Sequence, residues 1–70
     1  MIQLKAPMVG QVIRVEAKAG ATVAQDDAVV VLESMKMELP VTAPKDGIVK
    51  QVRVETGDIV QEGDVVAVIE

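Results

Sequence analysis

The sequence contains one unit written twice, and this repeat constrains the fold more than any other feature. Shifted by 37 positions, residues 6–33 (APMVGQVIRVEAKAGATVAQDDAVVVLE) align without a gap with residues 43–70 (APKDGIVKQVRVETGDIVQEGDVVAVIE), and 11 of the 28 aligned pairs are identical. A solenoid needs about three copies or more to bury its stacking faces. Two copies therefore predict a closed pair of halves related by a pseudo-two-fold axis.

The composition of each copy predicts an all-β fold. The chain has fifteen valines and no aromatic residue, and β-branched side chains suit a pleated sheet better than a helix. No window of ten or more residues shows helical apolar spacing with an N-cap. We expect a flattened β-barrel or sandwich of about eight short strands, in which Ile2–Lys5 and Met37–Thr42 lead into the two copies. Seventy residues allow one domain at most, spanning residues 1–70.

Glycine and aspartate mark the turns between these strands. Asp46-Gly47, Gly57-Asp58 and Gly63-Asp64 supply residues that accept positive φ where strands reverse. In the first copy Asp26 takes the place of Gly63. Asp tolerates the left-handed region better than most residues, so we expect the same turn there at a modest strain.

Composition also narrows the possible partners. The formal charge is −4, from eleven carboxylates against seven scattered Lys and Arg, and no aromatic side chain is present to stack on a base. There is no Cys or His to bind zinc, no leader-like segment and no long apolar run. We expect a cytoplasmic, monomeric domain that binds neither nucleic acid nor membrane.

The linker between the copies, SMKMELPVT, breaks a local rule. Residues 29–34 and 37–42 are both strand-like, which leaves Met35-Lys36 as a two-residue hairpin loop. Such loops normally require Asn-Gly or Gly-X. A departure from this residue preference that brings no structural gain points to a functional site. The two-fold arrangement places this tip at one end of the molecule and both termini at the other. An exposed lysine is usually only a solvated charge, and methionines usually fill a core, but neither methionine beside a turn can be deeply buried.

The whole chain resembles the biotinyl carrier domains of the biotin–lipoyl attachment family. The motif ESMKME is similar to their attachment motif, and APMVGQV, APKDGIV, the turns at Gly20 and Gly57, and GDIVQEGDVVAVIE resemble the flanking segments. The gapless 37-residue offset leaves no room for the thumb-like insertion of some members. Two positions depart from the family pattern, Ser34 where Ala is frequent and Asp26 where a turn Gly is usual.

The resemblance implies a carrier rather than an enzyme. It implies covalent biotin on Lys36, with Met35 and Met37 beside the biotin arm, and it implies that Glu33, Ser34 and Glu38 face a biotin protein ligase. The domain would then shuttle a carboxyl group between the biotin carboxylase and carboxyltransferase components of a carboxylase or transcarboxylase, or serve a decarboxylase. The chain holds no base of its own for Lys36, because it lacks His and Cys and Ser34 has no triad partner.

Three other functions remain open from the sequence. An unmodified structural or interaction barrel would show no mass increase in cells grown with biotin. A lipoyl carrier would use the same lysine, but the related lipoyl domains resemble Asp-Lys-Ala at the tip. Copper binding by the thioethers of Met35 and Met37 would need more soft ligands and no cation between them.

Overall fold

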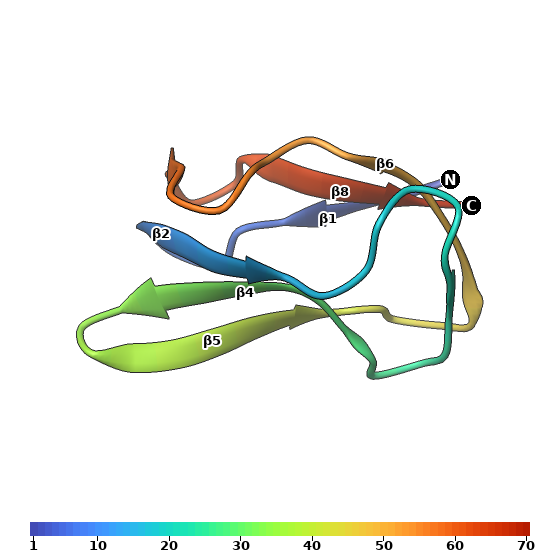
Figure 1. Cartoon of the computed structure of the whole chain (residues 1–70), viewed down its shortest axis with the longest axis horizontal. Coiled ribbons are helices and arrows are strands. Elements are labelled where there is room, and N and C mark those ends of the chain that lie inside the picture. The colour runs from blue at the N-terminus through green and yellow to red at the C-terminus, as the bar shows by residue number, and fades with distance from the viewer.

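The computed structural model describes all 70 residues as two four-stranded antiparallel sheets packed face to face (Figure 1). The eight strands are β1 (Ile2–Lys5), β2 (Gly10–Val15), β3 (Thr22–Val23), β4 (Ala28–Ser34), β5 (Met37–Thr42), β6 (Gly47–Val52), β7 (Ile59–Val60) and β8 (Val65–Ile69). The all-β expectation and the number of strands are confirmed. The chain contains no helix, and so it has no helix that is long and apolar enough to cross a membrane.

Strands of the two copies are interleaved in both sheets. The strand orders are β1-β8-β6-β3 and β5-β4-β2-β7, and the 37-residue shift converts one order into the other. Hydrogen bonds between the copies also occur as twins: the N–H of Gly63 donates to the carbonyl of Ala6 at 2.9 Å, and the N–H of Asp26 donates to the carbonyl of Ala43 at 2.8 Å. The predicted pseudo-two-fold relation is therefore present down to individual backbone bonds.

The core between the sheets is aliphatic. Fifteen buried residues form one cluster, and no polar or charged residue is buried in the molecule. Its largest completely enclosed members are Leu32, Ile69, Val12, Val29, Val30, Val49 and Val66. Because no disulfide, aromatic ring or buried polar network is present, hydrophobic burial supplies most of the stabilisation of this small fold.

The turns follow the prediction at all but one position. Gly57 (φ 99°), Gly63 (φ 87°) and Asp26 (φ 73°) lie in the left-handed region, as expected. The expectation for Asp46-Gly47 was wrong, because Gly47 does not have positive φ and instead begins β6. A Cβ at Gly47 would lie 2.7 Å from the carbonyl oxygen of Glu70, so close backbone packing is what requires glycine there.

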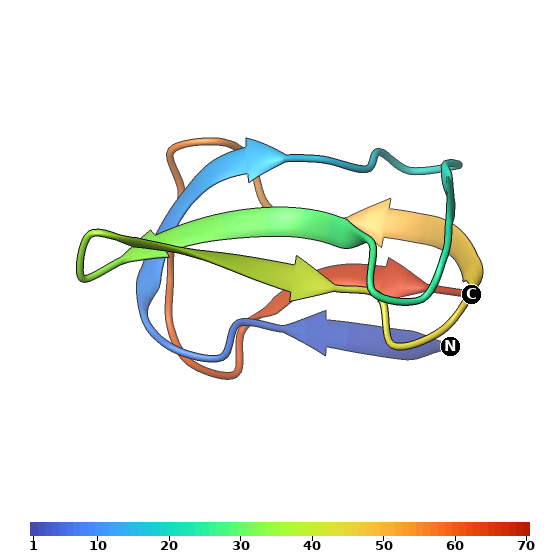
Figure 2. The same ribbon diagram turned by 90° about the horizontal axis from the view of Figure 1, so that it is seen from below.

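The β4–β5 hairpin protrudes at one end of the molecule. Figures 1 and 2 show its turn projecting beyond the other loops, with both chain termini at the opposite end. The molecule measures 30 × 18 × 17 Å, so it is elongated along the strands. The predicted placement of the Met35-Lys36 tip away from the termini is confirmed.

Candidate functional site

The tip is a two-residue turn in a left-handed conformation. Ser34 pairs with Met37 at the end of the β4–β5 ladder, and the two residues between them both have positive φ, 54° at Met35 and 63° at Lys36. A type I′ turn requires positive φ at both central positions, which is why Asn-Gly is its usual sequence. Two bulky L-residues in the left-handed region cost about 1–2 kcal/mol each. The hairpin therefore holds Met-Lys in a conformation that these residues do not prefer.

The side chains at this turn are open to solvent. Met35 is 83% exposed and Met37 is 61% exposed, so neither belongs to the core, as the sequence predicted. Lys36 is also exposed, and it makes no side-chain hydrogen bond and no ion pair. The amine at the tip is thus free to be covalently modified.

The three residues expected to face a ligase lie next to the turn, but they differ in accessibility. Glu33 and Glu38 are exposed and directly opposite one another on β4 and β5. Ser34 is half-buried at the end of β4. The two carboxylates and the amine of Lys36 therefore lie on one protruding hairpin, whereas Ser34 offers less of its surface.

Arg14 is a neighbour of the site that the sequence did not identify. It lies on β2, its Nη2 is 2.8 Å from Oε1 of Glu38, and its Nε is 3.2 Å from Oε1 of Glu16. A hydrogen bond from Arg14 to Glu38 bridges strand β4, which lies between β2 and β5. Arg14 and Glu38 are 24 positions apart, and only the sheet order brings them together.

The ion pair with Glu38 changes the acid–base properties of Arg14. The hydrogen bond to Glu38, followed by its charge, raises the pKa of Arg14 above the ordinary arginine value. A raised pKa in the folded state means that the pair stabilises the fold at neutral pH, and that this contribution is lost in strongly alkaline solution as the pH rises through the pKa of Arg14. Both side chains are half-exposed or more, so the pair positions Glu38 but adds little stability.

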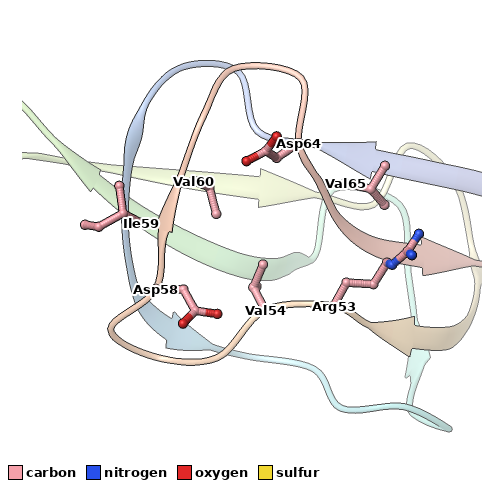
Figure 3. Close-up of a pocket in the computed structure, with 7 residues that line it drawn as sticks. All are labelled: Arg53, Val54, Asp58, Ile59, Val60, Asp64 and Val65. Carbon is pink, nitrogen blue, oxygen red and sulfur yellow. The ribbon is translucent and has the colours of Figure 1, made fainter.

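No hollow of the surface adjoins Lys36. Of the three hollows, the one in Figure 3 lies between the end of β6 and the start of β8, and includes Asp58 and Asp64. These carboxylates accept hydrogen bonds from the backbone N–H groups of Glu55 and Gln61, at 2.9 and 2.8 Å, so they close turns. The pseudo-two-fold relation repeats this hollow at the other end of the molecule, which identifies it as a by-product of the fold.

A small all-β sandwich that presents one unpartnered lysine on a protruding turn has the architecture of a carrier domain. The chain matches the model of the biotin–lipoyl family, described as a biotin-requiring enzyme, over residues 2–69. The protein belongs to this family.

The relatives include a long carboxylase subunit and a short biotinylated protein. The chain is 53% identical over 64 residues to the biotin-dependent acyl-coenzyme A carboxylase alpha3 subunit of Mycobacterium leprae, covering 91% of this chain and 11% of that protein. It is 46% identical over 66 residues to the biotinylated protein TB7.3 homolog of the same organism, covering 94% of this chain and 93% of that protein. The chain therefore spans a small fraction of one relative and nearly the whole of the other.

Solved structures agree on the fold. The urea carboxylase of Kluyveromyces lactis matches with a TM-score of 0.94 at 36% identity, over 99% of this chain and 6% of that one. The lipoyl domain of the 2-oxoglutarate dehydrogenase complex of Azotobacter vinelandii matches with a TM-score of 0.84 at 28% identity, over 100% of this chain and 96% of that one. A part of a carboxylase and a lipoyl domain thus share this sandwich.

Proposed function

We propose that the protein is a biotin carrier domain whose Lys36 becomes biotinylated by a separate biotin protein ligase and then serves biotin-dependent carboxylase components. One observation carries the proposal: the exposed, unpartnered amine of Lys36 lies at the protruding end of the molecule between two exposed methionines. The relatives named as biotinylated protein and as biotin-dependent carboxylase support the choice of cofactor.

The chain supplies an acceptor amine and leaves activation to its partner. A lysine amine in water is almost wholly protonated at neutral pH, and this chain has no His or Cys that could serve as a base for it. The ligase must therefore remove the proton and activate the carboxyl group of biotin. The nitrogen of Lys36 then forms an amide bond as the activating group leaves, and the site loses its positive charge.

The structure of the tip suits a residue that must enter more than one active site. Met35 and Met37 offer apolar, flexible surface on either side of the attachment point. Glu38 is fixed by Arg14, and Glu33 lies opposite it, so the ligase would meet a preformed acidic surface beside the lysine. Biotin, when attached, supplies the chemistry of carboxyl transfer, and tethering gives it a high effective concentration at its partner sites.

Substitution of the lysine tests the attachment site directly. Lys36→Arg keeps the charge and approximate length, but an arginine is not acylated at neutral pH. We expect streptavidin to label the unsubstituted chain after co-expression with a biotin protein ligase, and to label Lys36→Arg not at all. Lys45→Arg, at another exposed lysine, serves as the matched control and should be labelled normally. Labelling of the Lys36→Arg variant would place the site elsewhere.

A lipoyl carrier is the second candidate, because the lipoyl domain of the 2-oxoglutarate dehydrogenase complex shares the fold over the whole chain. The flanking Met35 and Met37 favour biotin through the resemblance of the tip. Intact mass measured after expression in cells supplied with both cofactors distinguishes the two modifications. An unchanged mass under all conditions would instead support an unmodified interaction barrel.

A further inference from the structure

One outer face of the molecule gathers three cationic side chains along a single groove. Lys5 on β1, Lys50 on β6 and Arg53 just beyond β6 line a groove of about 550 Å³, together with Met1, Gln3, Gln51 and Val68. No Asp or Glu takes part in the lining. We call these seven residues the basic face. It holds three of the seven cations of a chain whose net charge is −4.

Sheet geometry explains how this face is built. Gln3 and Gln51 flank Val68 of the central strand β8 from both sides. The register of β6 against β8 shifts between Val49 and Gln51, and the extra residue is Lys50, which is exposed next to Gln51. Five members of the face therefore lie on strands of the sheet. Arg53 follows β6, and its backbone N–H donates to the carbonyl of Val66 at 2.9 Å.

The opposite sheet lacks this excess of positive charge. The 37-residue offset places Glu16 where Arg53 lies and Arg14 where Gln51 lies. Arg14 forms both ion pairs of the molecule, with Glu16 and Glu38, so its charge is balanced locally. Two sheets with the same backbone thus carry different charge distributions.

The cations of the basic face have no partner within the molecule. Lys5, Lys50 and Arg53 take part in no ion pair and no side-chain hydrogen bond. In Figure 3 the guanidinium of Arg53 points away from the carboxylates of Asp58 and Asp64. The charges of these three side chains are therefore not neutralised by any ion pair within the chain.

We propose that the basic face is a docking surface for a carboxylate-rich surface of a partner protein. Complementary charge speeds the association of two proteins and fixes their relative orientation. Gln3 and Gln51, on either side of Val68, can donate and accept hydrogen bonds at the centre of such a contact. A phosphate ligand fits less well. Phosphate sites use converging free backbone N–H groups at a helix N-terminus or a nest. Strand β8 forms ladders with β1 on one side and β6 on the other, so its N–H groups are used within the sheet. The surface goes beyond the proposed biotin attachment and does not involve Lys36.

Amide NMR of the 70-residue chain, titrated with hexaglutamate peptide at low ionic strength, tests the proposal. We expect shifts confined to β1, β6, β8 and Arg53. Lys5→Gln/Lys50→Gln should weaken binding by about fivefold, because two exposed ion pairs are lost. Lys18→Gln/Lys45→Gln, with the same change of charge elsewhere on the surface, should leave binding unchanged.

Several results would overturn the docking surface. One is a set of shifts spread evenly over all lysines, and another is equal weakening of peptide binding by both double variants. Tighter binding of inorganic pyrophosphate than of the peptide to the same groups would also contradict it. A concentration-dependent dimer in sedimentation would make a second copy of the chain the occupant. Both double variants should still be labelled by streptavidin after co-expression with the ligase. A loss of peptide binding and a loss of biotin attachment are therefore separate outcomes.

Discussion

The strained turn at the tip predicts that Met35→Asn stabilises the protein. Met35 has φ 54° and is 83% exposed, so its replacement removes strain and almost no buried surface. Asn tolerates the left-handed region and is the usual first residue of a type I′ turn. We expect a gain of about 0.5–1 kcal/mol in the free energy of unfolding, which for a domain of this size corresponds to a rise in melting temperature of roughly 2–8 °C.

Thermal unfolding followed by circular dichroism measures this effect. Met37→Asn is the matched control, because Met37 is also exposed but lies on β5 without positive φ. The control should show no gain, since Asn is disfavoured in strands. Because the turn type is kept, loading of Lys36 by the ligase should continue in Met35→Asn. A melting temperature that falls or stays constant in Met35→Asn would refute the argument that the tip is strained.

Three further outcomes follow from the packing and the charge of the molecule. Gly47→Ala should lower the free energy of unfolding by about 1–3 kcal/mol in urea titrations, because its Cβ would lie 2.7 Å from a backbone oxygen, and unchanged stability would contradict the close packing. Leu32→Ala removes a fully buried side chain and should cost about 2–5 kcal/mol, much of the total for so small a fold, as the same titration would show. Biotinylation of Lys36 changes the formal charge from −4 to −5, so the modified protein should migrate faster toward the anode on a native gel, and equal mobility would count against modification.

Much of the fold could be predicted because the repeat and the turn residues act locally. The offset of 37 predicted paired halves, and the positive φ at Asp26 followed from its alignment with Gly63. The turn at Met35-Lys36 was also predictable, since the strands on either side leave only two residues between them. Gly47 shows the limit of this approach, because its role depends on contact with Glu70, the last residue of the chain.

The sequence alone determined that the chain forms two interlocking β halves, with one lysine at the turn between them. It could do so because strand period, turn chemistry and repeat length are encoded in the order of residues along the chain. Only the tertiary structure decided which distant side chains meet. The bond from Arg14 to Glu38 and the gathering of Lys5, Lys50 and Arg53 on one face both depend on strand order and register. These depend on long-range pairing, which places residues in contact regardless of their separation along the chain.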